Sequence, residues 1–219
     1  MLRLPLLDGG APVRRVLAVG AHADDIEIGC GATLLALQRA YELDVTWVVL
    51  AADGAREAEA RASASAFLAG SVSHTVVCHR FRDGYLPYVG GEVKDVFEEL
   101  KDELDPQLVL THTRKDLHQD HRLVCELTWN TWRDHLILEY EIPKFDGDLT
   151  SPNVFVPVSE ELAQEKIRLV LDAFSSQRDR HWFDEELFLG FMRVRGMEAR
   201  SPSGYAEAFT CRKLSLLVG

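Results

Sequence analysis

Two short clusters of histidines and acids contain most of the residues in this chain that could do chemistry. They are His22, Asp24, Asp25 and Glu27 in the first cluster and Asp116, His118, Asp120 and His121 in the second. Two pairs are spaced three residues apart, His22 with Asp25 and His118 with His121. Two imidazoles and one carboxylate, with a fourth position left open for water, form the ligand set of a catalytic zinc site. The spacing therefore predicts a metal centre built from these side chains.

The polar residues beside such a centre have roles that hydrolysis would use. A bound metal lowers the pKa of its water towards neutrality, which makes Asp24 available as a general base and His118 as a general acid or oxyanion partner. Asp120 could hold His118 in one tautomer, as carboxylates near metal sites do for imidazoles. Glu27 could tie down the loop or orient a ligand. Each cluster alone also has a structural explanation, because acids just before a helix stabilise its dipole.

Strands and helices alternate along the chain and place both clusters at strand ends. Apolar and β-branched runs predict strands at 15–21, 44–51, 72–79, 107–112, 135–142 and 153–158. Helical spacing of apolar residues predicts helices at about 31–42, 55–69, 93–104, 122–132, 159–174 and 185–198. This alternation predicts parallel βαβ units in a doubly wound α/β sheet. The clusters follow the strands at 15–21 and 107–112, and the carboxyl ends of strands are where such sheets bind ligands.

Composition narrows the class of protein. The 219 residues contain no Gly/Ser/Pro linker, so we expect one domain over 1–219. Lys and Arg number 24 against 35 Asp and Glu, a net charge of −11 that argues against a nucleic-acid partner. The four cysteines lie far apart, which suits reduced thiols. With no secretory segment and no apolar run of about 18 residues, we expect a cytoplasmic protein that does not insert into membranes.

The two clusters also resemble the signatures of a known family. AHADDIEIGCGATL, at 21–34, resembles the AHPDDxExxxGG signature of the PIG-L/LmbE-like metal-dependent de-N-acetylases, and HQDHR, at 118–122, resembles the family's HPDHR. The resemblance continues at 56–59, at 83–84 and at 204–209. Ala23 and Gln119 stand where the family has proline, and the loss of both prolines relaxes the two loops. Cys30 replaces the first glycine of the GG pair in the first signature.

The resemblance implies a fold, an activity and a set of roles. The fold is a Rossmann-like three-layer sandwich with a mostly parallel sheet, and the activity is metal-dependent removal of an N-acetyl or other N-acyl group from an amino sugar or glycoside. The implied metal is Zn²⁺, or Fe²⁺ as the alternative, and a homo-oligomer such as a trimer or hexamer is implied too. The implied metal ligands are His22, Asp25 and His121, and the implied general base is Asp24. His118 is implied to stabilise or protonate the intermediate, with Asp120 holding the His118 ring. Arg56 and Asp83 are implied to contact substrate hydroxyls.

Several alternatives stay open at this point. The same centre could act as an amidase on a thiol-sugar conjugate, or the fold could bind sugars without turnover. Arg56 could only pair with Glu59, and Asp83 could only make its turn. Arg193 and Arg195 could pair with the acidic excess or meet a substrate anion. Cys30 and a group of other histidines are interpreted as packing, structural or surface residues, the histidines being His74, His79, His112, His135 and His181.

Overall fold

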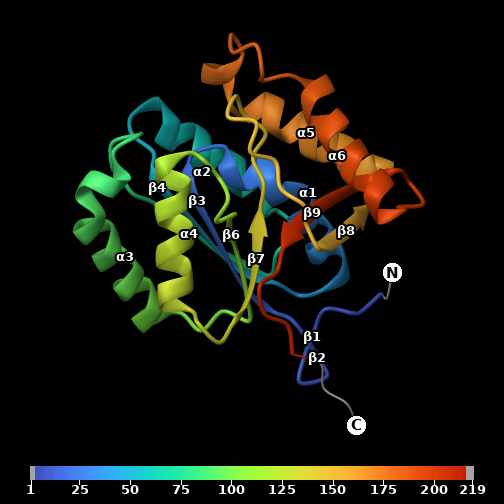
Figure 1. Cartoon of the computed structure of the whole chain (residues 1–219), viewed down its shortest axis with the longest axis horizontal. Helices are drawn as coiled ribbons and strands as arrows, with labels where there is room; N and C mark the ends of the chain where they lie inside the picture. The colour runs from blue at the N-terminus through green and yellow to red at the C-terminus, as the bar shows by residue number, and fades with distance from the viewer. Residues whose placement is uncertain (1–2, 216–219) are drawn as a thin grey trace.

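The apolar runs of the chain pair into a seven-stranded sheet in the order β5-β4-β3-β6-β7-β9-β8 (Figure 1). The structure is a computed structural model and describes residues 3–215. The strands of this sheet are β3 (Arg15–His22), β4 (Asp44–Ala51), β5 (Ser73–Cys78), β6 (Leu108–His112), β7 (Leu136–Tyr140), β8 (Val154–Val158) and β9 (Tyr205–Thr210). Neighbouring strands from β5 to β7 run parallel, whereas β9 is antiparallel to both β7 and β8. A separate hairpin pairs β1 (Leu7–Asp8) with β2 (Ala11–Pro12).

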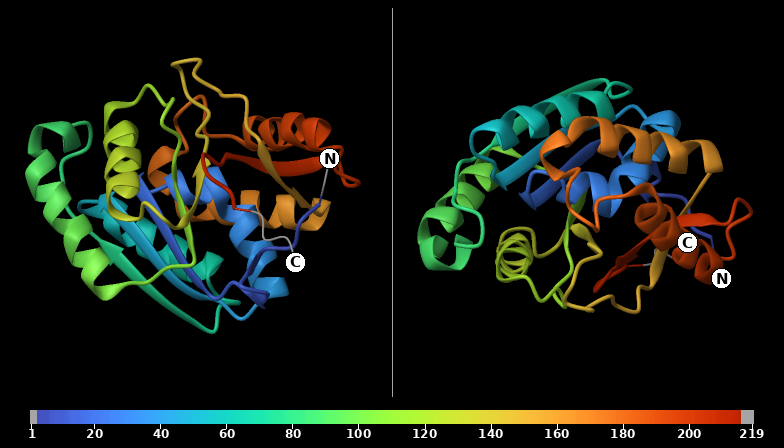
Figure 2. Two further views of the ribbon diagram at one scale, coloured as in Figure 1. Left: turned by 60° about the horizontal axis from the view of Figure 1, so that its bottom comes forward. Right: turned by 90° about the horizontal axis from the view of Figure 1, so that it is seen from above.

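Helices cover both faces of the sheet, which confirms the predicted three-layer α/β sandwich (Figure 2). They are α1 (Asp25–Ala40), α2 (Ala55–Phe67), α3 (Gly90–Glu103), α4 (Gln119–Thr131), α5 (Glu160–Ala173) and α6 (Glu185–Ala199), with short 3₁₀ turns at Leu86–Val89 and Ser175–Gln177. Helices α1, α2 and α5 pack together on one face, and α3 and α4 lie on the other. Helix α6 packs on β9 and β8. No helix among residues 3–215 is long and apolar enough to cross a membrane.

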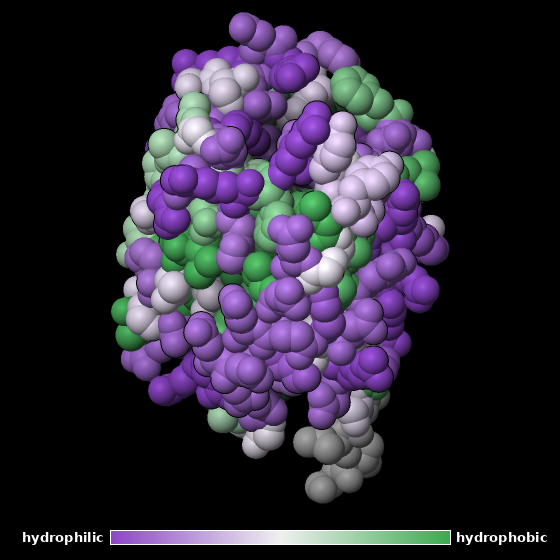
Figure 3. Space-filling model, turned by 90° about the vertical axis from the view of Figure 1, so that its left-hand side faces the viewer, coloured by the Kyte–Doolittle hydropathy of each residue, from purple (hydrophilic) through white to green (hydrophobic). Residues whose placement is uncertain are grey.

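The alternation of side chains along the central strands divides the core in two. Val16 and Ala18 of β3 point into the cluster under α1, α2 and α5, whereas Leu17 and Val19 point into the cluster under α3 and α4. A strand buried on both faces needs such a continuous apolar run. The outer surface on the side of α3 is largely hydrophilic, with hydrophobic residues gathered near its middle (Figure 3).

The main differences from the predicted elements are the hairpin of β1 and β2, for which no strands are predicted, the start of α1, and strand β9. Helix α1 begins at Asp25 instead of near residue 31, and it contains a break at Cys30. Strand β9 was not predicted, and it inserts between β7 and β8. Its carboxylate residue Glu207 is buried at 4% exposure, so a charged residue interrupts the apolar pattern of a strand interior.

The order of the strands creates one switch point. After β3 the chain adds β4 and β5 on one side and then returns to place β6 on the other side of β3. Open α/β sheets bind ligands outside the carboxyl ends of the strands at such a point. His22 ends β3 and His112 ends β6, so the switch point has a histidine on each of its two strands.

Candidate metal centre

The three predicted metal ligands meet at the switch point. His22 ends β3, Asp25 opens α1, and His121 lies in the first turn of α4. The Nδ1 atom of His22 lies 3.1 Å from Nε2 of His121 and 3.3 Å from Oδ2 of Asp25. Oδ1 of Asp25 lies 3.5 Å from Nε2 of His121. Two imidazole nitrogens and a carboxylate facing one another at these distances suit a divalent ion with nitrogen and oxygen ligands.

Carboxylates engage the outward nitrogens of both histidines. Asp116 Oδ2 lies 2.9 Å from Nδ1 of His121. Oδ2 of Asp120 and Oδ1 of Asp83 each lie 3.1 Å from Nε2 of His22. A carboxylate on the far nitrogen fixes the orientation of a ligating imidazole and leaves its other nitrogen free for the metal. The residues present therefore fit a metal site in two respects. The three ligand atoms face one another, and carboxylates hold both imidazoles from behind.

The structure places the Asp120 carboxylate differently from the sequence-based expectation. Instead of holding His118, it contacts His22 and accepts hydrogen bonds from the backbone N–H groups of Gly84 at 2.7 Å and Leu86 at 3.1 Å. The reason is local, because His118 is the N-cap of α4 and its Nδ1 accepts the backbone N–H of Asp120 at 3.3 Å. This bond places the proton of neutral His118 on Nε2.

Two residues that sequence reasoning did not assign to the site also belong to it. His112 is fully buried, its Nε2 lies 3.2 Å from Oδ2 of Asp25, and it accepts the backbone N–H of Ala21 at 3.0 Å. Its interpretation as a structural or surface residue overlooked that it closes the strand next to β3. Lys144 contacts Oδ2 of Asp116 at 2.8 Å. No sequence signal pointed to Lys144, because it comes from the loop after β7.

Arg56 lies beside the predicted general base. Its Nη2 is 3.1 Å from Oδ2 of Asp24, and its Nη1 is 3.2 Å from Oε2 of Glu59. The pairing with Glu59 therefore exists, but it is not the only one. Burial raises the pKa of Asp24, and the Arg56 guanidinium opposes that rise. Arg56 thus helps to keep a buried carboxyl ionised, as a base requires.

The protonation of the other groups follows from burial and neighbouring charges. Burial alone would raise the pKa of Asp25, but His121, His112 and His22 hold it well below its usual range. Burial together with the nearby His112 lowers the pKa of His121 to about 4. Burial also lowers the pKa of His118. Neutral His121 has a lone pair to offer a metal, and neutral His118 has an Nε2–H to donate.

The residues whose roles stayed open have structural partners. Arg195 is 5% exposed and pairs with Glu141 and Glu198 at 2.9 and 2.8 Å. Arg193 donates to the carbonyl of Gly204 at 2.8 Å. The fully buried Cys30 donates its thiol to the carbonyl of Ile26 at 3.3 Å. Ion pairing and packing therefore account for these three side chains.

The fold and site together define an α/β protein with a histidine–carboxylate cluster at the switch point of its sheet. The PIG-L family model, described as GlcNAc-PI de-N-acetylase, matches residues 17–132, and the chain belongs to this family. A search of curated protein sequences finds no match.

Several solved structures share the fold. N,N'-diacetylchitobiose deacetylase from Pyrococcus horikoshii is 21% identical with a TM-score of 0.71, over 91% of this chain and 84% of its own. The zinc-inhibited form of teicoplanin deacetylase Orf2 is 19% identical with a TM-score of 0.69, over 92% of this chain and 100% of its own. GalB, the 4-carboxy-2-hydroxymuconate hydratase of Pseudomonas putida KT2440, is 17% identical with a TM-score of 0.69, over 94% of this chain and 99% of its own. At these identities the likeness establishes the fold, and the hydratase shows that the fold alone does not fix the reaction.

Proposed function

We propose that this protein is a metal-dependent hydrolase that removes an N-acetyl or other N-acyl group from an amino sugar or glycoside. The observation that carries the proposal is the meeting of His22, Asp25 and His121 donor atoms within 3.1–3.5 Å of one another, beside the buried carboxylate of Asp24. Membership of the PIG-L family and the deacetylases among the similar structures support the same reaction.

The proposed ligands are His22 through Nδ1, His121 through Nε2, and Asp25 through its carboxylate. This donor set suits Zn²⁺, with Fe²⁺ as the alternative. A divalent ion bound there supplies a Lewis acid that polarises the amide carbonyl and makes water acidic enough to attack near neutral pH. The carboxylates of Asp116 and Asp120 keep the two imidazoles turned towards that ion.

Asp24 and His118 are the proposed catalytic groups. Asp24 accepts the proton of the attacking water, and the Arg56 guanidinium, 3.1 Å from its Oδ2, opposes the rise in the pKa of this carboxyl that burial causes. His118 donates a hydrogen bond from Nε2–H to the oxygen of the tetrahedral intermediate, and the proton that Asp24 has taken from the water passes to the departing amine. The ring of His118 lies 4.9 Å from that of His22 and 4.6 Å from that of His121, centroid to centroid, so it is next to both proposed histidine ligands.

Arg56 and Asp83 are the proposed contacts to sugar hydroxyls. Both lie beyond the carboxyl ends of the parallel strands, and the Asp83 side chain is 79% exposed while it touches His22. An arginine fork and a carboxylate can hydrogen-bond neighbouring hydroxyls and turn the acylamino group towards the metal. We also propose one catalytic domain over residues 1–219, a homo-oligomer, a cytoplasmic location and no nucleic-acid partner.

One experiment tests the proposal against its alternatives. Amine release is measured from N-acetylglucosamine derivatives, acylated sugar–thiol conjugates, N-acetylated amino acids and acetanilide, and metal content is determined on the same samples. We expect cleavage of the sugar derivatives by protein with about one metal per chain, and little metal or activity in His121→Ala. Cleavage of sugar–thiol conjugates alone would favour the amidase, and metal-loaded protein that binds but cleaves none would favour a sugar-binding protein.

A further inference from the structure

Helix α1 is broken directly behind the proposed metal ligands. At Cys30 the backbone leaves the helical region, with φ −146° and ψ 16°, so that 25–29 and 31–40 form two helical segments. The first segment is little more than one turn, and it carries Asp25 with Asp24 just before it. A helix break frees carbonyl groups at the end of one segment and N–H groups at the start of the next. Those groups are buried and need partners.

A buried ion pair supplies partners on both sides of the break. Lys166 of α5 donates from Nζ to the carbonyl of Ile28 at 2.6 Å and to Oε1 of Glu207 at 2.6 Å. Glu207 of β9 accepts the backbone N–H groups of Ala32 at 3.0 Å and Thr33 at 2.6 Å. Each of the two charged side chains is only 3% exposed. The pair therefore caps the end of the first segment and the start of the second.

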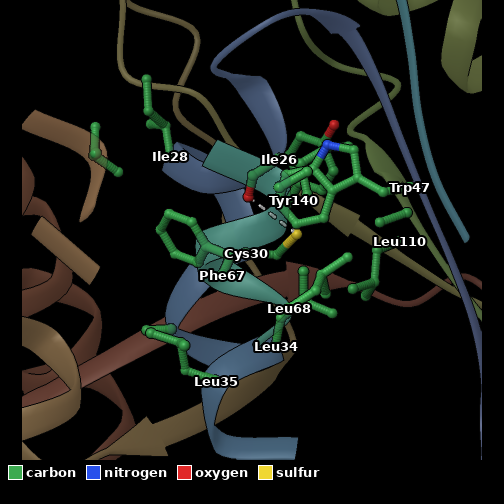
Figure 4. Packing of buried hydrophobic residues seen from close by; sticks show 14 of the residues in the cluster. Ile26, Ile28, Cys30, Leu34, Leu35, Trp47, Phe67, Leu68, Leu110 and Tyr140 are labelled. Atoms are coloured by element: carbon green, nitrogen blue, oxygen red, sulfur yellow. Dashed lines mark hydrogen bonds between the residues drawn. The ribbon is translucent and has the colours of Figure 1, made fainter. Parts of the chain in front are cut away.

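Aromatic rings hold the break from two sides (Figure 4). A methyl group on Gly29 would overlap the Tyr140 ring, and one on Gly31 would lie 2.7 Å from the Phe67 ring. The Tyr140 hydroxyl donates to the carbonyl of Val19 in β3 at 2.7 Å. The first segment is thus fixed against the strand that ends in His22.

A short chain of hydrogen bonds joins the ion pair to the proposed catalytic residues. Lys166 holds the carbonyl of Ile28, and the N–H of Ile28 donates to the carbonyl of Asp24 at 3.0 Å. Asp25 then turns its carboxylate back to accept the N–H of His22 at 2.6 Å. The ion pair and the metal ligands lie at opposite ends of the same helical turn.

We propose that Lys166 and Glu207 are positioning residues, which hold this turn so that Asp24 and Asp25 keep the geometry that metal binding and catalysis require. The inference rests on the proposed metal site. A buried ion pair is often replaceable by apolar groups without loss of stability. We therefore test the ion pair by its effect on metal affinity and turnover as well as on stability.

The main test variant is Lys166→Met/Glu207→Gln, which removes both charges so that neither is left buried alone. Lys166→Met alone is the second variant, because it frees the Ile28 carbonyl while Glu207 keeps its two N–H donors. Ile167→Ala is the control, since this 2% exposed neighbour on α5 packs in the core and makes none of the hydrogen bonds that cap the break. Zinc affinity is measured by competition with a chelator on folded protein, alongside thermal unfolding, kcat and KM.

We expect the double variant to bind zinc about 10–100-fold more weakly than the parent, the range seen when groups that orient metal ligands are removed. Its kcat should fall more than its KM rises, and Lys166→Met should show the same change in smaller measure. Ile167→Ala should lose thermal stability and keep parental zinc affinity. Parental zinc affinity and kcat in both Lys166 variants, or equal loss of affinity in Ile167→Ala, would overturn the inference. Failure of the proposed function is distinct, because the parent protein itself would then bind no metal or release no amine.

Discussion

Asp116 holds His121 from the side opposite to His22, with its Oδ2 atom 2.9 Å from Nδ1 of the imidazole. Lys144 contacts the same oxygen at 2.8 Å. Burial alone would raise the pKa of Asp116, but the contacts with His121 and Lys144 hold it well below its usual range. An ionised carboxylate at this position keeps the proton of His121 on Nδ1, and Nε2 then faces the proposed metal.

The first prediction follows from this contact. Asp116→Asn should weaken zinc binding by about 10–100-fold, because the amide cannot replace the charge that orients and strengthens His121 as a ligand. Chelator competition on the folded variant measures the change. Asp148→Asn is the matched control, since Asp148 also contacts Lys144, at 2.6 Å, but not His121. Equal affinities of the parent and Asp116→Asn would show that His121 does not depend on this carboxylate.

The second prediction separates the two neighbouring aspartates. Asp24→Asn should keep the metal and lose about 10²–10⁴-fold in turnover, the usual contribution of a general base. Asp25→Asn should lose metal and activity together, because its carboxylate lies within 3.5 Å of both histidine donors. Elemental analysis and amine release on the same samples check both. Near-parental turnover in Asp24→Asn would remove Asp24 from the role of base.

Most of the fold followed from local patterns. The apolar runs that became β3, β4, β6 and β7 are largely buried, and their alternation with helices predicted a parallel sheet. The sequence pattern did not predict strand β9, because the charged residue Glu207 lies in its interior. Only the folded chain pairs Glu207 with a lysine from a distant helix. The early start of α1 was missed for a similar reason. Its first turn depends on Tyr140 and Lys166, which only the folded chain brings to it.

The candidate site likewise has contacts that the sequence could predict and contacts that only the folded structure shows. The meeting of His22, Asp25 and His121 could be predicted, because their loops follow neighbouring parallel strands. The partner of Asp120 could not, since it depends on which way the first turn of α4 faces. Lys144 is set by a loop after β7 that has no regular pattern of its own.

The third prediction concerns Glu27, a buried acid in the first turn of α1. It is 1% exposed, and burial raises its pKa to about 8. A glutamate in an unfolded chain has a pKa of about 4.3. Between that pH and about pH 8 the folded state therefore holds a proton on Glu27 that the unfolded state releases. This stabilisation is complete below about pH 4.3 and is lost as the pH rises towards 8, by up to about 1.4 kcal/mol per pH unit.

Glu27→Gln should remove that dependence. Denaturant unfolding of chelator-treated protein between pH 5 and 8 is the measurement, and the variant should gain stability over the parent as the pH increases. Glu92→Gln, at an exposed position, removes the same charge and should leave the pH dependence of the parent intact. Parallel stability curves for the parent and Glu27→Gln would place the pKa of Glu27 near its ordinary value.

The last prediction distinguishes two carboxylates that share one nitrogen. Asp83 and Asp120 both lie 3.1 Å from Nε2 of His22, but the Asp83 side chain is 79% exposed and that of Asp120 is fully buried. Asp120 also accepts two backbone N–H groups, from Gly84 and Leu86. Its position is therefore fixed, so Asp120 alone can hold His22, whereas Asp83 is free to meet a ligand.

Asp83→Asn should keep the parental zinc affinity and raise KM for N-acetylglucosamine derivatives by about tenfold, the effect of losing one charged hydrogen bond of roughly 1.5 kcal/mol. Asp120→Asn should instead weaken zinc binding, because an amide on Nε2 orients His22 less firmly. Zinc competition and steady-state kinetics on both variants separate the two effects. A loss of zinc in Asp83→Asn with none in Asp120→Asn would reverse the two roles, making Asp83 the residue that holds the metal ligand and leaving the sugar without its proposed carboxylate contact.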